Sequence, residues 1–191
     1  MNKLIFALAT LVSLDVSASQ YIEYMKKMEH KVDNLRCVDH PIFCQIKKNN
    51  PKLDKSYAVQ VSNIIYAMTK KYNLRPHIYT AILAQESMYN LGAKNCTTGV
   101  KTLPNGHNAK TETTICVDFG ISQINYKTAK AYGFDLDRLV SDLHYSIEAG
   151  AIVLSDMKKM YHANEDDYWT RYNSSKKTFR EEYRRLVERF M

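Results

Sequence analysis

One glutamate occupies a position where its carboxyl group could act as a general acid. Four apolar residues before it recur at the spacing of one helix face: Ile78, Ala81, Ile82 and Leu83. Glu86 follows Ile82 by four residues and Leu83 by three, so it projects from that face. Burial there raises the pKa of a carboxyl group and keeps it protonated near neutral pH, as a general acid requires. Periodicity alone still favours the competing interpretation, a solvated glutamate at a helix end.

Other common catalytic patterns are missing from the sequence. The six histidines form no paired helical zinc motif, and there is neither a Gly-x-Ser-x-Gly elbow nor a phosphate-binding glycine loop. Cys37, His40 and Cys44 are close together, but their spacing is not that of a zinc knuckle and no second ligand pair follows. We therefore predict neither a metal site nor a cofactor.

Four helices are predicted from apolar periodicity and end signals. The first runs from Ser56 as N-cap to about Asn73, and Pro76 opens the helix that carries Glu86. A third helix covers residues 143–161, and its small residues 149–151 would let another backbone approach closely, so we expect it to be central. The last begins at a capping box formed by Thr178 and Glu181. No segment shows convincing strand alternation.

Two cysteine pairs are expected to staple local loops. Residues 91–118 are rich in glycine and threonine, which favours a loop excursion, although a short hairpin inside it stays open. Four cysteines in an exported chain indicate disulfides, and we favour Cys37 with Cys44 and Cys96 with Cys116. Each pair would close a short loop.

The N-terminal residues are typical of an export signal. Lys3 precedes an apolar run at residues 4–14, and a small-residue stretch with a cleavage site near Ala18 follows. We predict a signal peptide at 1–18, an N-terminal arm at 19–55 with a short helix around 24–35, and one domain at 56–191. The run is too short to span a bilayer comfortably, so we expect a soluble protein of the periplasm, cell wall or exterior, with no stable membrane insertion once the signal is removed. An uncleaved anchor is the alternative, because Asp15 is an unusual neighbour for the cleavage site.

The net charge of +7 indicates an acidic partner. Nucleic acid is not expected, because the basic residues are spread along the chain and no nucleic-acid motif is present. They gather moderately near the C-terminus, at Lys176, Lys177, Arg180, Arg184, Arg185 and Arg189. A solvated helix face explains that group equally well.

Four motifs together carry a family resemblance. They are Ala-Gln-Glu-Ser at 84–87, Phe-Gly-Ile-Ser-Gln-Ile-Asn at 119–125, Ile-Glu-Ala-Gly-Ala-Ile-Val-Leu at 147–154 and Arg-Tyr-Asn-Ser at 171–174. In this order the chain resembles the lysozyme-like lytic transglycosylase family over about residues 57–175. The resemblance implies a mainly α, lysozyme-like single domain that acts on peptidoglycan glycan strands. The members closest in size accompany secretion, conjugation and pilus systems or are phage wall-degrading proteins.

The resemblance also implies roles for five residues. Glu86 becomes the catalytic acid and base, which first protonates the glycosidic oxygen and then deprotonates the sugar 6-hydroxyl to leave a 1,6-anhydromuramic end. The substrate's own N-acetyl group would supply the nucleophile. Tyr172 and Ser87 match helpers beside the acid, while Gln123 and Asn173 are expected to contact the substrate.

The chain departs from the family pattern around residue 120. Ile121 and Ser122 stand where the family has Leu-Met, and the preceding excursion is longer than usual and brings in Asp118. A second carboxylate opposite Glu86 would permit a hydrolytic muramidase, which uses water. We favour a turn role for Asp118. A third hypothesis is a non-catalytic wall-binding scaffold.

Structural roles compete at several of these positions. Gly120 and Gly150 are better explained by backbone geometry and close packing than by chemistry. Tyr172 could be an ordinary core tyrosine with a satisfied hydroxyl. Trp169 could stack on a sugar ring or lie in the core, and the sequence does not decide between them.

Overall fold

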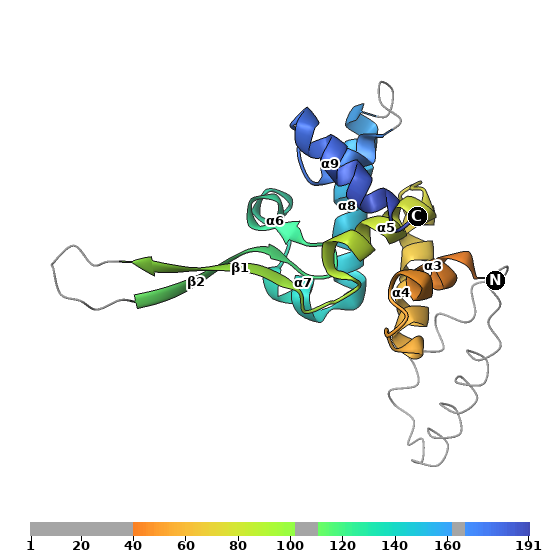
Figure 1. Ribbon diagram of the computed structural model, residues 1–191, viewed down its shortest axis with the longest axis horizontal. Coiled ribbons are helices and arrows are strands. Elements are labelled where there is room, and N and C mark those ends of the chain that lie inside the picture. The colour runs from red at the N-terminus through yellow and green to blue at the C-terminus, as the bar shows by residue number, and fades with distance from the viewer. Residues whose placement is uncertain (1–39, 102–110, 162–166) are drawn as a thin grey trace, which may run out of the picture. The chain divides into compact units, whose positions relative to one another are not determined.

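Helices dominate the computed structural model, which describes residues 40–101, 111–161 and 167–191 (Figure 1). The mainly α prediction is therefore confirmed for the described part of the chain, where a small three-stranded sheet accompanies the helices. In chain order the elements are α3 (Pro41–Asn49), α4 (Lys55–Lys71), α5 (Pro76–Ser87), β1 (Lys94–Lys101), β2 (Thr111–Phe119), β3 (Ile124–Asn125), α6 (Tyr126–Tyr132), α7 (Leu136–Ser141), α8 (Leu143–Tyr161), η2 (Tyr168–Tyr172) and α9 (Lys177–Glu188). The predicted signal peptide, the helix around 24–35 and Cys37 lie outside the described residues.

Helix α5 is the most deeply buried helix segment and follows the prediction closely. Pro76 occupies its first turn, where a missing N–H costs nothing, and every residue from 78 to 84 is buried. The helix ends in left-handed backbone at Met88 and Tyr89, with φ of 53° and 67°. Asn50 Nδ2 and Tyr57 Oη donate to the carbonyls of these two residues, each at 3.1 Å. Helices α3 and α4 therefore hold the turn that follows Glu86.

Helix α8 spans the predicted residues 143–161 and packs on α4, α7 and η2. The close packing predicted from its small residues occurs at Gly150, against Ser122 and Tyr79. A Cβ atom there would lie 2.5 Å from Ser122 Oγ and 2.6 Å from Tyr79 Oη, so only glycine leaves room for these neighbours. Ser122, where the family has methionine, is fully buried against this gap and donates to the Ser146 carbonyl at 2.8 Å. Ser122 therefore has a packing role in the core.

The hairpin left open for residues 91–118 forms, and it is longer than expected, because most of the segment pairs as two antiparallel strands. Strands β1 and β2 pair from Lys94 opposite Phe119 to Lys101 opposite Thr111, and Figure 1 shows them extending away from the helices. The β-branched residues of 111–117 favour a strand, but the glycines and threonines around them obscured the pattern. Cys96 and Cys116 lie opposite each other in the register and form the predicted disulfide. Cys44 is also disulfide-bonded.

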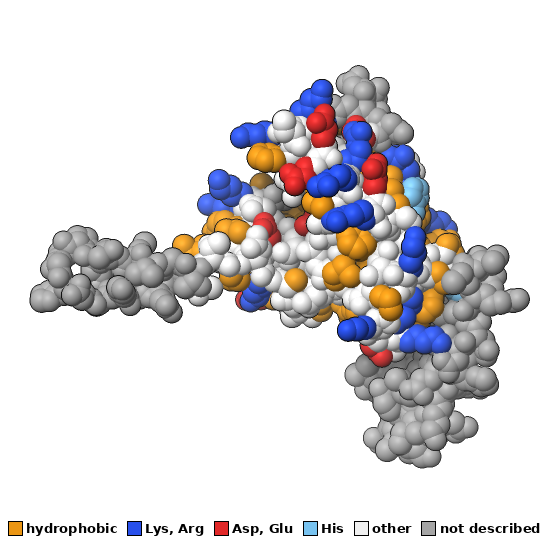
Figure 2. Space-filling model, viewed as in Figure 1, with side chains coloured by type: hydrophobic (Ala, Val, Ile, Leu, Met, Phe, Trp, Pro, Cys, Tyr) orange, Lys and Arg blue, Asp and Glu red, His pale blue; other side chains and the backbone are white. Residues whose placement is uncertain are grey.

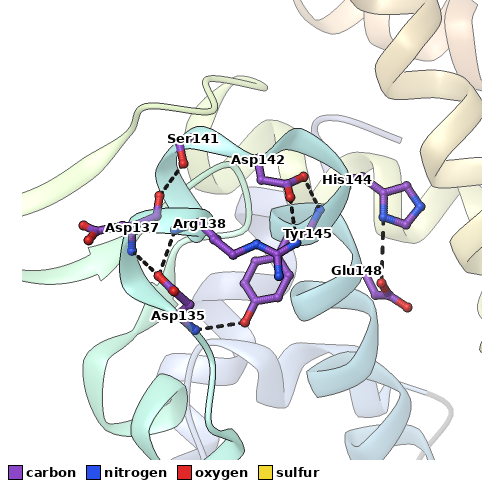
Figure 3. A network of polar contacts seen from close by, with 8 residues as sticks. All are labelled: Asp135, Asp137, Arg138, Ser141, Asp142, His144, Tyr145 and Glu148. Atoms are coloured by element: carbon purple, nitrogen blue, oxygen red, sulfur yellow. Dashed lines mark hydrogen bonds and ion pairs between the residues drawn. The ribbon is translucent and has the colours of Figure 1, made fainter. Parts of the chain in front are cut away.

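Gly120 follows β2 and lies directly against α7. Its φ is 77°, and a Cβ atom there would lie 2.0 Å from the Leu139 carbonyl oxygen. Helix α7 is fixed on α8 by a polar network (Figure 3): Arg138 pairs with Asp142 at 2.8 Å and lies over the Tyr145 ring, whose hydroxyl accepts from the backbone N–H of Asp135 at 2.9 Å. The network therefore fixes α7, whose Leu139 carbonyl lies against Gly120.

Two helix starts differ from the prediction. Asp54 caps α4, because its side chain accepts from the backbone N–H of Tyr57 at 2.8 Å, and Ser56 lies inside the helix. Helix α9 begins after Lys176 without a side-chain cap, so the expected capping box of Thr178 and Glu181 does not form. Helices α6 and α7 were not predicted, because six or seven residues carry too little periodicity to identify a helix.

Helix α3 belongs to the same compact unit as the rest, which begins at His40. Gln45 Nε2 and Asn49 Nδ2 both donate to the Phe190 carbonyl, at 2.9 and 3.0 Å, and so join α3 to the end of the chain. Asn49 Nδ2 also lies 3.1 Å from Tyr89 Oη. Within residues 40–101, 111–161 and 167–191, no helix is long and apolar enough to cross a membrane.

Candidate active site

A cleft beside the sheet contains the glutamate predicted to act as an acid. It has a volume of about 390 Å³, and five of the residues lining it are Glu86, Asp118, Gln123, Tyr172 and Asn173. These residues come from α5, β2, the segment after Gly120 and the end of η2. Four of the five predicted functional residues therefore meet in one cleft, together with Asp118.

The Glu86 carboxyl group is held in a desolvated position. Burial raises its pKa to about 7, opposed by a hydrogen bond from Tyr183 and reinforced by the negative charge of Asp118. Tyr183 Oη donates to Glu86 Oε1 at 2.5 Å. A pKa near the working pH suits a group that must both give and take a proton.

Ser87 and Tyr172 fix the backbone between Gly120 and Gln123. Ser87 Oγ donates to the Ile121 carbonyl at 2.8 Å, and Tyr172 Oη donates to the Ser122 carbonyl at 2.8 Å. Ser87 faces a different depression from Glu86. Tyr172 lines the cleft, but the hydrogen bond of its hydroxyl goes to the backbone rather than to Glu86.

Gln123 has both a cleft position and a structural contact. Its backbone is left-handed, with φ of 46°, and its Nε2 donates to the carbonyls of Ala93 at 3.1 Å and Gly120 at 2.8 Å. These two carbonyls lie just before β1 and just after β2. Gln123 therefore ties the base of the hairpin to the cleft.

Asp118 is not the turn residue we favoured. It lies on β2 opposite Asn95 of β1 and Asn125 of β3. Asn95 Nδ2 donates to Oδ2 at 2.8 Å and Asn125 Nδ2 donates to Oδ1 at 2.9 Å. The three residues are neighbours across the sheet, so the two asparagines orient a second carboxylate in the cleft. The residue was assigned to a turn because a loop was favoured for this segment and a hairpin was kept only as an alternative.

Tyr183 is the contact to Glu86 that the sequence interpretation missed. In the sequence it belongs to an apolar stripe of the last predicted helix, together with Phe179, Leu186, Val187 and Phe190, and packing is a sufficient explanation for a tyrosine there. A smaller depression of about 170 Å³ lies between α5 and α9 and shares Glu86 and Asn173 with the cleft. Phe179, which is 51 % exposed, lines this second depression. Open space therefore flanks Glu86 on two sides.

A comparison with protein families decides the identity of the fold. The model of the Transglycosylase SLT domain matches residues 63–187. The chain belongs to this family. SLT domains are lysozyme-like lytic transglycosylases, enzymes that cleave peptidoglycan, so peptidoglycan is the substrate of this domain. No curated protein and no solved structure matches the chain.

The residues matched by the SLT family model include every cleft residue discussed above. The match begins within α4 and ends at Val187 in α9, so it includes Glu86, Asp118 and Tyr183. Helix α3 precedes it, although its Asn49 and Asn50 hold the turn after Glu86. The part before the match therefore contributes to the shape of the active site.

The surface and the buried residues of the SLT domain clarify three further predictions. Figure 2 shows lysine and arginine side chains spread over the visible face, with acidic side chains between them around α9. This mixture of charges favours a solvated surface over a single basic patch that binds anions. Trp169 is 5 % exposed and belongs to the core. Among the described residues no group of histidine, cysteine, aspartate and glutamate side chains is arranged to hold a metal ion.

Proposed function

We propose that Glu86 cleaves the β-1,4 bond between N-acetylmuramic acid and N-acetylglucosamine without water. Its protonated carboxyl group gives a proton to the glycosidic oxygen, and the resulting carboxylate then takes the proton of the muramic 6-hydroxyl, which attacks the anomeric carbon. The bond to the leaving sugar breaks and a bond to O6 forms. The products are a free 4-hydroxyl and a 1,6-anhydro ring, so atoms and charges balance.

The observation that carries the proposal is the buried position of Glu86 in a cleft of the SLT domain, where desolvation raises its pKa to about 7. A group that serves first as acid and then as base works best when its pKa lies near the working pH. An exposed glutamate, with a pKa near 4.3, would have lost its proton before the reaction began. The cleft volume of about 390 Å³ is also in the range of small-ligand sites.

The other predicted residues support this chemistry by fixing its surroundings. Ser87, Gln123 and Tyr172 hold the backbone of residues 120–123 at the floor of the cleft. Asn173 lines both depressions beside Glu86 and is exposed, so it is available to contact sugar hydroxyl or acetamido groups. The substrate's own N-acetyl group stabilises the positive charge at the anomeric carbon, and this role requires no second carboxylate.

Asp118 favours one second candidate, hydrolysis by a muramidase. Its carboxylate lines the same cleft as Glu86 and is oriented by two asparagines, as a residue that activates water or stabilises a cationic intermediate would need. Its negative charge also contributes to the raised pKa of Glu86.

Asp118→Asn separates the two candidates. The transglycosylase proposal expects this variant to retain activity within about tenfold, because its acid and nucleophile are intact and only an auxiliary charge is lost. A muramidase that depends on Asp118 loses about a thousandfold or more. The measurement is the rate of soluble fragment release from purified peptidoglycan, run in ¹⁸O water. Incorporation of ¹⁸O into the new muramic acid ends of the wild-type products would refute the non-hydrolytic route.

We further propose that the protein is exported and opens the wall locally, for remodelling or penetration by a secretion, conjugation, pilus or phage assembly. The signal-like residues 1–18 and the Cys96–Cys116 disulfide support export. N-terminal sequencing of the secreted protein checks this, with a start at Ser19 expected and an intact cytoplasmic chain as the contrary result.

A further inference from the structure

The cleft that contains Glu86 is also lined by a basic side chain, that of Lys127. Among the described residues that line this cleft, Lys127 is the one cation, and Glu86 and Asp118 are the acids. Lys127 is exposed and belongs to the first turn of α6, which follows β3 directly and packs against β2 and β3 (Figure 1). The sheet that carries Asp118 therefore also places a positive charge at the cleft.

The backbone of Lys127 is fixed by a residue that also orients Asp118. Asn125 Oδ1 accepts from the backbone N–H of Lys127 at 3.0 Å, and Asn125 Nδ2 donates to Asp118 Oδ1 at 2.9 Å. The other oxygen of Asp118 accepts from Asn95 at 2.8 Å. The Asp118 carboxylate thus takes its hydrogen bonds from two neutral amides, and Lys127 is not its partner within the described structure.

The ammonium group of Lys127 has no protein partner among residues 40–101, 111–161 and 167–191, either in a hydrogen bond or in an ion pair. Two other lysines contrast with it, because Lys71 pairs with Glu148 at 2.5 Å and Lys159 pairs with Asp156 at 2.9 Å. A lysine carries three hydrogen-bond donors on a flexible stem. A cation that lines a binding cleft in this state is available to an anionic group of the ligand.

The anionic groups of a peptidoglycan strand are carried by one substituent of its sugars. The hydroxyl and acetamido groups of both sugars are neutral, but the lactyl group on O3 of N-acetylmuramic acid ends in a carboxyl group. That group is a free carboxylate on a strand without peptides. On other strands it is amide-linked to a stem peptide, which carries carboxylates of its own. N-acetylglucosamine has no such substituent, so a cation in the cleft can distinguish the two alternating sugars.

We propose that Lys127 binds the carboxylate carried by the O3 substituent of N-acetylmuramic acid and so sets the register of the glycan strand beside Glu86. This inference rests on the proposed function, because the strand must lie in the Glu86 cleft. Lys127 is then a specificity-determining residue: it favours the register in which a muramic acid unit, and not a glucosamine unit, lies next to α6.

The test compares Lys127→Met with Lys130→Met in the full-length protein. Lys130 is a matched control, because it is an exposed lysine of the same helix and does not line the cleft. Lys127→Met is expected to raise KM on solubilised, peptide-bearing strands about 3- to 10-fold with kcat nearly unchanged, as for loss of a partly exposed contact to a charged group. The difference from the wild type should shrink at high salt, which screens exposed charges. Lys130→Met should keep the wild-type KM.

Calorimetric titration of three ligands identifies the carboxylate and separates this inference from the proposed function. Both substitutions are placed in a Glu86→Gln background, so that the strands stay intact. The ligands are strands with stem peptides, strands stripped of peptides by an amidase, and stripped strands whose lactyl carboxyl groups are coupled to methylamine.

Lys127→Met should weaken binding of the charged strands and leave the methylamidated strands unaffected. Weaker binding of stripped strands assigns the lactyl carboxylate, and weaker binding of peptide-bearing strands alone assigns a carboxylate of the peptide. An equal loss on the methylamidated strands, or the same affinity for every strand as in Lys130→Met, overturns the inference. If Lys127→Met weakens binding but the wild type releases no fragments, the inference stands and only the proposed function fails.

Discussion

Glu86→Gln is expected to reduce the cleavage of peptidoglycan by about a thousandfold or more, in the range for removal of a general acid. The amide has nearly the shape of the carboxyl group, and its oxygen can still accept the hydrogen bond from Tyr183. It can neither give a proton to the glycosidic oxygen nor take one from the 6-hydroxyl. The loss should therefore fall on kcat, with binding of the glycan retained.

The measurement is fragment release from purified peptidoglycan, with circular dichroism to confirm the fold. Glu181→Gln supplies a matched control, because it makes the same chemical change at an exposed position of α9, where the side chain is 61 % exposed. It should keep the wild-type rate. A well-folded Glu86→Gln enzyme that retained a tenth of the activity would show that another group serves as the acid.

Glu86→Gln is also expected to be more stable than the wild type above neutral pH. The pKa of Glu86 is about 7 in the folded protein, compared with 4.5 for an ordinary solvated glutamate. The folded chain therefore holds this proton more tightly, so the stability that the protonated group contributes is complete below pH 4.5 and is lost as pH rises through 7. A difference of about 2.5 pKa units corresponds to about 3 kcal/mol in the free energy of unfolding.

Urea unfolding at pH 4.5 and pH 8 measures this effect. The variant should gain about 3 kcal/mol relative to the wild type between the two pH values, because glutamine does not titrate. Glu181→Gln should follow the wild-type curve, since it changes no buried charge. The result against this prediction is a difference in the free energy of unfolding between wild type and Glu86→Gln that is the same at both pH values. It would mean that Glu86 is solvated, the competing interpretation for a glutamate at a helix end.

Local sequence signals account for the helices that form the frame of the site. The proline at the start of α5 and the apolar spacing up to Leu83 place Glu86 correctly, because both depend on residues within a few turns. The small residues of α8 likewise predicted the close contact at Gly150. The disulfide between Cys96 and Cys116 followed from spacing and compartment.

The features that were missed depend on contacts between distant segments. The row of Asn95, Asp118 and Asn125 exists only when three strands pair in one register, and no single segment encodes that register. The contact of Tyr183 with Glu86 depends on how α9 packs against α5. On a helical apolar stripe a tyrosine is sufficiently explained by packing, so its hydroxyl gave no separate signal.

The mass of the new glycan ends tests the central claim most directly. Peptidoglycan digested by the full-length protein is analysed by mass spectrometry of the released muropeptides. Non-hydrolytic cleavage by Glu86 predicts anhydromuramic ends, lighter than hydrolysis products by one water, ~18 Da. Reducing muramic ends, present in the wild-type digest and lost with Asp118→Asn, would contradict the account and identify the enzyme as a muramidase.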